Sequence, residues 1–264
     1  MSTFIYVSES LTSSGHEDAR PELASPASAP RPPQRPTDAA PEPSAPAPAP
    51  APAPAIIEAR GFGMATHDPA FTDLDIVIPA GRFAAVVGPA GAGKSTLLLA
   101  LTGRMRPVTG DLRVGGVDAR RHPGQVRTLT SIARIVGLIE PESSLTLEDC
   151  LTERTLFDGA HPRSRTALYL HAARLLGLEA PLTTLFGALP PLDQTRAALA
   201  LACVRPATVV ALDDLDDDTT LEDQRALWEG IAALTADGQP VIASTTERTV
   251  IPDDAIIIDL EPEA

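Results

Sequence analysis

The residues from Gly88 to Thr96, GPAGAGKST, have the types and the spacing of a loop that binds phosphate. They fit the pattern G-x-x-x-x-G-K-[ST] at every position. The glycines let the backbone wrap closely around phosphate oxygens, with its N–H groups pointing inward. Lys94 supplies a positive charge for the β- and γ-phosphates, and the hydroxyl of Ser95 can coordinate Mg²⁺. The spacing therefore predicts a nucleotide site.

The segments on both sides of this loop are those that the motif requires. The run RFAAVVG (82–88) is typical of a strand buried on both faces, and KSTLLLALTGRM (94–105) has the pattern of a helix. A coincidental glycine-rich turn is the alternative, and the complete motif in this context disfavours it. The expected nucleotide contacts are Gly88, Pro89, Ala90, Gly91, Ala92, Gly93, Lys94, Ser95 and Thr96.

The rest of the chain alternates between strand-like and helix-like segments. Further strands are predicted over 55–60, 73–78, 111–116, 132–139, 208–214, 240–245 and 255–260. Helices are predicted over 147–158, 163–177 and 221–237, with another that begins near Pro191. This order predicts an α/β fold around a largely parallel sheet, with a helical insertion near residues 145–205.

The first part of the chain differs from the rest in composition. Thirteen of the 27 prolines fall between Pro21 and Pro54. Proline fixes φ, and this segment has almost nothing to bury, so we expect a disordered or extended Pro/Ala-rich tail over 1–54 and one domain over 55–264. The tail fits a solubilising extension better than a proline-rich recognition segment.

Charge and hydropathy exclude several classes of protein. The formal net charge of -14 argues against a nucleic-acid binder, which needs a basic face. No segment approaches the ~20 apolar residues that cross a bilayer, and the first residues lack the pattern of a secretory signal. Cys150 and Cys203 have no metal-ligand spacing, so we expect reduced, buried cysteines of a cytosolic protein.

A second acidic feature ends a later buried strand. In TVVALDD (208–214), Asp213 is the candidate ligand for Mg²⁺. It lies much farther from Lys94 than the corresponding acid does in small GTPases and nucleotide kinases, and the chain has no N-K-x-D sequence. These two classes of nucleotide-binding protein are therefore disfavoured.

From about Ile56 to its end, the chain resembles the nucleotide-binding subunit of ABC (ATP-binding cassette) transporters. Three segments carry the resemblance in order: DIVIPAGRFAAVVGPAGAGKSTLLLALTGRMRPVTGDLRVGG, SLTLEDCLTER and ALALACVRPATVVALDD. The resemblance implies a P-loop NTPase fold of ABC type: a mostly parallel sheet flanked by helices, an antiparallel β portion and a helical subdomain at about 145–205. It also implies ATP and Mg²⁺ as ligands, with Ser95 and Asp213 on the metal and Asp214 and Lys94 in catalysis.

Members of this family work as head-to-tail dimers with ATP between the two subunits. The resemblance therefore implies a homodimer or heterodimer of ATPase domains that acts with a separate transmembrane subunit and binds no nucleic acid. It implies a cytoplasmic place, peripheral on the inner face of the cell membrane.

The sequence departs from the family at the segment that would reach a partner's ATP. LPPLD (189–193) stands where the family has L-S-G-G-Q, so Pro190 replaces the serine and Pro191 the first glycine. Proline has no N–H to offer a phosphate. Because proline fits the first turn of a helix, we interpret the pair as a structural helix start rather than as an ATP contact.

Other positions are also altered. Asp214 stands for the catalytic glutamate, Thr246 for the switch histidine, and Gly137 for the glutamine of the Q-loop. In the acidic run that continues through Asp216, Asp217 and Asp218, we expect only Asp213 and Asp214 to face the nucleotide and the rest to form a solvated turn.

The aromatic residue that stacks on adenine in the family has no clear counterpart here. Thr66 or His67 stands near its position, and Phe62 and Phe71 are more distant candidates. Together, these features predict an ATP-binding subunit that hydrolyses ATP weakly. The alternatives are a non-hydrolytic regulatory or assembly module and the degenerate half of a heterodimer.

Overall fold

A five-stranded sheet carries the phosphate loop at one of its edges. In the computed structural model, its strand order is β6-β7-β8-β3-β9, and every neighbouring pair is parallel. The strands are β6 (Thr130–Arg134), β7 (Val209–Leu212), β8 (Val241–Thr245), β3 (Ala84–Val87) and β9 (Ile256–Asp259). All residues of β3, β7 and β8 are buried, as their continuous apolar sequences predict.

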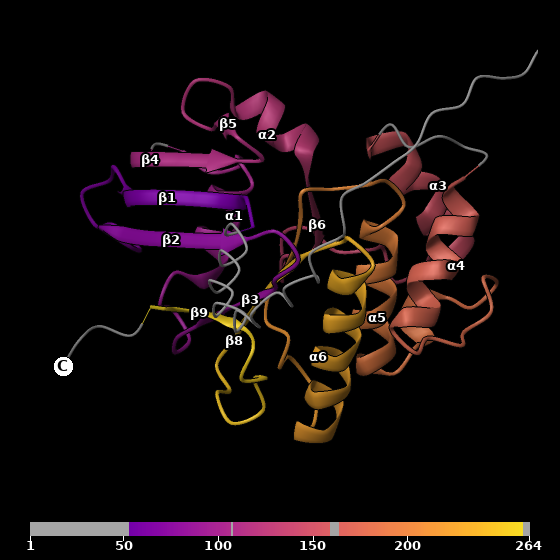
Figure 1. Cartoon of the computed structure of the whole chain (residues 1–264). Coiled ribbons are helices and arrows are strands. Elements are labelled where there is room, and N and C mark those ends of the chain that lie inside the picture. Colours follow the sequence, from indigo (N-terminus) through magenta and orange to yellow (C-terminus); the bar gives the residue numbers. More distant parts are fainter. Residues whose placement is uncertain (1–52, 107, 159–163, 261–264) are drawn as a thin grey trace, which may run out of the picture. The chain divides into compact units, whose positions relative to one another are not determined.

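A second, antiparallel sheet lies on one side of the first (Figure 1). Its strand order is β2-β1-β4-β5. The strands are β1 (Ala55–Met64), β2 (Leu74–Pro79), β4 (Val108–Val114) and β5 (Val117–Asp118). The expected α/β fold, with a parallel sheet and an antiparallel portion, is confirmed.

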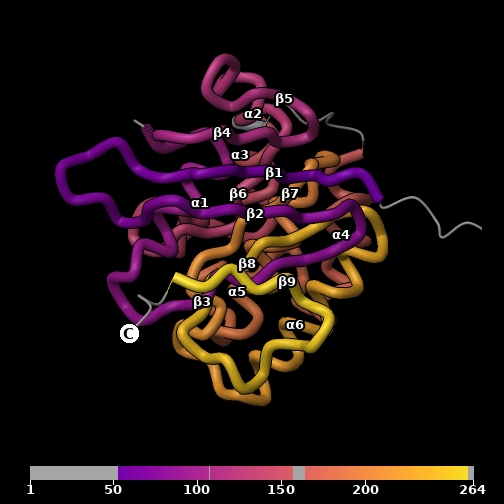
Figure 2. The backbone as a smooth tube through the Cα atoms, turned by 60° about the vertical axis from the view of Figure 1, so that its left-hand side comes forward, coloured from indigo at the N-terminus to yellow at the C-terminus, as the bar shows by residue number. Residues whose placement is uncertain are grey.

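The helices cover the parallel sheet on two sides. They are α1 (Lys94–Leu101), α2 (Pro123–Leu129), α3 (Leu147–Asp158), α4 (Arg165–Leu175), α5 (Pro191–Ala202) and α6 (Leu221–Ala236), with a short 3₁₀ helix η1 (Phe186–Ala188). Helices α3 to α6 lie together on the side away from the antiparallel sheet (Figure 1). In the turned view of Figure 2, β8, β9 and β3 lie between that sheet and α6. Helices α3, α4 and α5 fall within the predicted helical part at about 145–205.

Two hydrophobic cores meet at the parallel sheet because successive side chains of a strand point to opposite faces. In β3, Ala84 and Val86 pack with α1 and the antiparallel sheet, whereas Ala85 and Val87 pack with the helices α3 to α6. Side chains therefore pack against both faces of this short strand, and this packing fixes the position at which the following loop begins.

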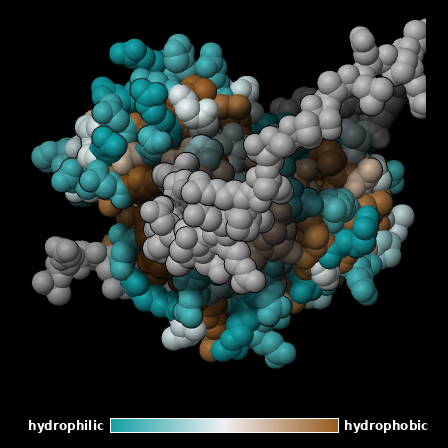
Figure 3. Space-filling view, in the orientation of Figure 1, coloured by the Kyte–Doolittle hydropathy of each residue, from teal (hydrophilic) through white to brown (hydrophobic). Residues whose placement is uncertain are grey.

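The structure describes residues 53–106, 108–158 and 164–260, all within one compact unit (residues 50–264). The predicted tail over 1–54 therefore lies outside the described residues, except for residues 53 and 54. Among the described residues, no helix is both long and apolar enough to span a bilayer. On the face shown in Figure 3, hydrophobic patches alternate with hydrophilic ones.

The largest differences from the sequence prediction lie at β6 and in the segment of α2 and β5 before it. The strand predicted over 132–139 ends at Arg134, because Gly137 has φ +72° and turns the chain so that Ile135 pairs with Ile139. The helix α2 and the short β5 were not predicted. In the seven residues of α2 only Val126 is buried, which leaves no helical periodicity to detect.

Helix α6 begins with a capping box that we expect to stabilise the domain. Thr220 accepts a hydrogen bond from the N–H of Asp223, and the Asp223 side chain accepts one from the N–H of Thr220. Thr220→Ala should lower the free energy of unfolding by about 1 kcal/mol. Thr220→Ser keeps the capping hydroxyl and should therefore retain most of this stability. Urea unfolding of the three proteins measures this, and equal loss in both variants would contradict a capping role.

Candidate functional site

The loop 88–93 joins the end of β3 to the first turn of α1 in a conformation that favours glycine at two positions. Gly91 and Gly93 have φ of +82° and +89°. A Cβ atom on Gly93 would lie 2.6 Å from the carbonyl oxygen of Ala70, whereas one on Gly91 would meet nothing within 4 Å. Gly93 therefore serves both the turn and the close approach of another segment.

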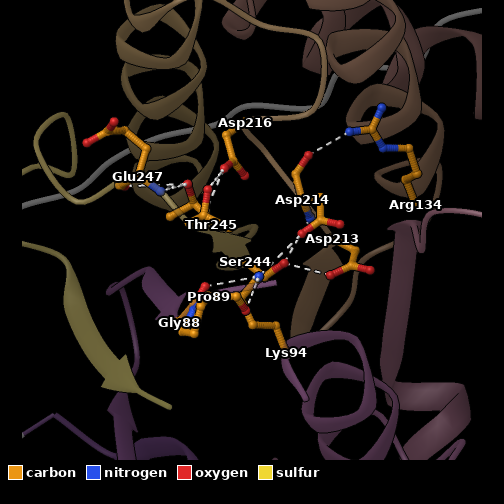
Figure 4. A network of polar contacts seen from close by, with 11 residues as sticks. Gly88, Pro89, Lys94, Arg134, Asp213, Asp214, Asp216, Ser244, Thr245 and Glu247 are labelled. Carbon is orange, nitrogen blue, oxygen red and sulfur yellow. Dashed lines mark hydrogen bonds and ion pairs between the residues drawn. The ribbon is translucent and has the colours of Figure 1, made fainter. Parts of the chain in front are cut away.

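Lys94 turns back into this loop. Its side chain is 6% exposed, and Nζ donates to the carbonyl oxygens of Gly88 (3.1 Å) and Pro89 (3.2 Å). Nζ also lies 3.8 Å from Oδ1 of Asp214 (Figure 4). Lys94 is the only lysine among the 21 lysine and arginine residues of the chain. A compact ammonium with three donors suits this enclosed position, whereas a planar guanidinium does not.

Asp213 follows β7 and is 1% exposed. Its Oδ1 accepts a hydrogen bond of 2.6 Å from Ser244 Oγ of the neighbouring strand β8 (Figure 4). Its N–H donates to the carbonyl oxygen of Arg134 at 3.0 Å. Ser244 of β8 thus holds the Asp213 side chain, and Arg134 of β6 holds its backbone.

The donors present fit Mg²⁺. Ser95 lines the cleft beside the loop, and Asp213 is buried next to it, directly after β7. A hydroxyl and a carboxylate oxygen are hard donors of the kind that Mg²⁺ takes. In the part of the chain that the structure describes, no group of three or more His, Cys, Asp or Glu is arranged to hold a metal. Magnesium bound with a nucleotide takes much of its coordination from phosphate and water.

Asp214 is in the left-handed region, with φ +42°. Its N–H donates to Ser244 Oγ at 2.8 Å, and its carboxylate faces Lys94. Burial raises the pKa of this carboxyl group, the negative charge of Asp213 raises it further, and Lys94 opposes both. The carboxylate therefore lies where it can accept a proton or orient a polar group at the end of the loop.

The phosphate loop, Lys94 and Asp214 border a cleft of about 480 Å³, whereas the buried Asp213 is not among the residues that line it. Of the predicted contacts, Ala90, Gly91, Gly93, Lys94, Ser95, Thr96 and Asp214 line it, together with Ala70, Asp216, Asp217 and Thr246. The other predicted loop contacts are not on its wall: Pro89 and Ala92 line an adjoining cleft of about 760 Å³, and Gly88 lies at the end of β3.

The acidic turn corrects one expectation. Asp216 and Asp217 were expected in a solvated turn away from the nucleotide, yet both line the cleft. The N–H and the hydroxyl of Thr246 both donate to Oδ2 of Asp216. Thr246, at the predicted position of the switch histidine, thus holds the acidic turn against the end of β8.

The two prolines start a helix, as predicted. Pro190 is the N-cap of α5 and Pro191 its first residue, and neither is among the residues lining the cleft. The first intrahelical bond runs from the N–H of Gln194 to the carbonyl oxygen of Pro190, and Nε2 of Gln194 donates to the carbonyl oxygen of Leu189.

The candidates for a base-stacking residue are placed differently from one another. Phe62 is fully buried and Phe71 is 5% exposed, with their ring centroids 5.5 Å apart, so the pair belongs to the core. Burial excludes Phe62 as a stacking residue. Thr66 and His67 are exposed, and Gly137 lies in an exposed turn outside the lining of the cleft.

The buried parallel strand β3, the glycine-rich loop with Lys94, and Asp213 at the end of a neighbouring strand define the class of P-loop nucleotide-binding proteins. The sequence profile of the family named "ABC transporter" matches residues 71–216, more than half of the chain. The chain belongs to the ABC transporter family.

Individual relatives agree with this assignment. The cobalt import ATP-binding protein CbiO of Rhodobacter capsulatus is 31% identical over 67% of this chain. The cytochrome c biogenesis ATP-binding export protein CcmA of Rhizobium meliloti is 31% identical over 69% of this chain and 85% of its own length. The match spans only 64% of CbiO and 65% of an ABC transporter ATP-binding protein of Pyrococcus furiosus, which is 25% identical.

Solved structures show the same fold. An ATP-binding protein from Pyrococcus furiosus has a TM-score of 0.64 at 20% identity, covering 77% of this chain and 96% of its own. A dimeric bacterial ABC transporter cassette has a TM-score of 0.63 at 17% identity, covering 77% and 94%.

The two left-handed glycines make a matched pair of variants. Gly93→Ala should abolish tight nucleotide binding, because its methyl group clashes with the Ala70 carbonyl and the loop must move. Gly91→Ala meets open space and carries only backbone strain of about 1–2 kcal/mol, so it should bind more tightly than Gly93→Ala. Isothermal titration of both variants with a non-hydrolysable ATP analogue and Mg²⁺ measures the difference, and equal affinities would contradict the close approach.

The raised pKa of Asp214 gives a pH-dependent stability. The folded state binds the proton more tightly than the unfolded state, so stability is lost as pH rises above the ordinary Asp pKa. Asp214→Asn should therefore have a higher Tm than the unsubstituted chain at pH 7, and the gap should shrink toward pH 4. Thermal melts of both proteins across this range, without nucleotide, provide the test. A gap that widens toward pH 4 would show the opposite sign.

Proposed function

We propose that this chain is an ATP-binding subunit that hydrolyses ATP weakly and acts with a separate membrane protein in transport. The observation that carries the proposal is the enclosed ammonium of Lys94 at the phosphate loop, 3.8 Å from the carboxylate of Asp214. Of the relatives described above, CbiO is a cobalt import protein and CcmA is an export protein, so the direction of transport is left open.

The proposed roles follow from position and chemistry. The loop N–H groups and Lys94 bind the β- and γ-phosphates, and Ser95 and Asp213 hold Mg²⁺, which supplies charge neutralisation at the phosphates. Asp214 accepts a hydrogen bond from the attacking water and orients it.

Three features support weak rather than fast hydrolysis. Asp214 is one methylene shorter than the glutamate it replaces, so its carboxylate reaches less far toward a water. Thr246 has no imidazole, and its hydroxyl is bonded to Asp216. In a homodimer, Pro190 and Pro191 would stand at both composite sites without an N–H for phosphate.

A second candidate function rests on these same departures. The chain would then be a nucleotide-binding regulatory or assembly module without turnover, or the degenerate half of a heterodimer in which another subunit supplies an intact signature segment. In each case the chain is expected on the inner face of the cell membrane through its partner.

The single lysine makes the proposal easy to test. Lys94→Ala removes a charge-assisted interaction of about 1.5–3 kcal/mol, so ATP affinity should fall ~10–100-fold and hydrolysis should stop. Lys94→Arg, which keeps the charge, should also bind poorly because the guanidinium does not fit the loop. Titration calorimetry and phosphate release assays measure both.

Amine acylation followed by mass spectrometry gives an independent measurement, since Lys94 carries the only ε-amino group of the chain. ATP with Mg²⁺ should slow its acylation. Acylation that ATP does not slow would remove the nucleotide-binding proposal, and phosphate release that Lys94→Ala leaves unchanged would remove only its hydrolytic part.

A further inference from the structure

Arg134 lies against the turn that carries Asp214. It is the last residue of β6, and its side chain is 9% exposed. Its Nη2 donates to the carbonyl oxygen of Asp214 at 2.8 Å, and its Nη1 lies 3.8 Å from Oδ2 of Asp217. In Figure 4 the guanidinium approaches Asp214 from the side opposite Lys94.

Several contacts hold the turn at Asp214. With φ +42°, Asp214 occupies a region that non-glycine residues adopt rarely, although aspartate adopts it more readily than most. Its N–H is held by Ser244 Oγ and its carboxylate faces Lys94. Its carbonyl oxygen accepts two hydrogen bonds, one from the N–H of Asp217 within the turn (3.1 Å) and one from Arg134 outside it. A residue whose own N–H and carbonyl oxygen are both held has a fixed backbone, and this fixes the direction in which its Cα–Cβ bond points.

The cost of burying Arg134 indicates more than packing. A buried guanidinium is expensive unless its charge is paired, and an apolar residue of similar volume would serve the core as well or better. The Nε of Arg134 is buried without a hydrogen-bond partner among the described residues. The contacts that offset this cost are those to Asp214 and Asp217, both of which line the cleft.

We propose that Arg134 is a positioning residue: its hydrogen bond to the Asp214 carbonyl holds the left-handed turn and keeps the Asp214 carboxylate directed at the phosphate end of the cleft. This inference rests on the proposed role of Asp214 in ATP hydrolysis. Arg134 does not line the cleft, and it acts through Asp214 rather than on the nucleotide.

Arg134→Gln should therefore separate turnover from binding. A misplacement of about 1 Å in a catalytic group can cost ~100-fold in rate, so kcat should fall at least ~10-fold. ATP affinity should stay within about two-fold, because the loop and Lys94 are untouched. Arg134→Lys keeps the charge and one donor and should recover part of the loss, with kcat reduced at least about three-fold from that of the unsubstituted chain.

Arg205 is the matched control. It donates to the carbonyl oxygens of Thr128, in α2, and of Thr130, the first residue of β6, and it does not line the cleft. Arg205→Gln removes comparable arginine–carbonyl bonds, so it should lower Tm and leave kcat within about two-fold.

The outcomes decide the proposal in either direction. A kcat for Arg134→Gln within two-fold of the unsubstituted chain, a Kd that rises in parallel with the fall in kcat, or equal losses in the Gln and Lys variants would overturn it. If Arg134→Gln does not fold, Arg134→Lys decides, and a kcat equal to that of the unsubstituted chain overturns the role.

Crystal structures of the full chain and its variants give a readout that does not depend on turnover. In Arg134→Gln, or in Arg134→Lys if only that variant folds, Asp214 should leave the left-handed region and its carboxylate should move away from Lys94. An unmoved Asp214 would overturn the positioning role. If the unsubstituted chain hydrolyses ATP no faster than Lys94→Ala, the proposed function is contradicted. The position of Asp214 in the crystal structures would still test the positioning role of Arg134.

Discussion

A buried ammonium group governs the arrangement of this site. Removing the charge of Lys94 from water is costly unless polar groups surround it, and the chain supplies two carbonyl oxygens from the loop and one carboxylate from Asp214. The carbonyl oxygens can reach Nζ of Lys94 only because the chain curves tightly after β3. The carboxylate can reach it only because the chain turns after β7. Both strands must therefore end at the same edge of the sheet.

The parallel sheet meets this requirement because the carboxyl ends of its strands lie at one edge. Arg134 ends β6, Asp213 follows β7, and Ser244 is near the end of β8, so three segments far apart in sequence become neighbours. Ser244 Oγ donates to the carboxylate of Asp213 and accepts a hydrogen bond from the N–H of Asp214. These bonds join residues that are close in space but far apart in the sequence, so the site forms only when the sheet forms.

This difference explains what the sequence could predict. The loop, its strand and its helix are contiguous, and glycine and lysine at fixed spacing specify them locally. The start of α5 at Pro191 was predictable for the same reason, since proline suits a first helical turn. The contacts of Arg134 and Thr246 with the acidic turn have no local signal, and a run of aspartates taken alone indicates a solvated turn.

The two cationic side chains at the site have different geometric tasks, which explains why one is a lysine and the other an arginine. Lys94 must fit inside a loop and donate in several directions from one point, which suits an ammonium group. Arg134 must reach a carbonyl and a carboxylate at once from outside the turn, which suits a planar fork. In a chain whose other cationic side chains are all arginine, the one lysine stands where a guanidinium does not fit. The phosphate loop thus keeps the chemistry that ATP binding requires, although the residues expected to drive fast hydrolysis are altered.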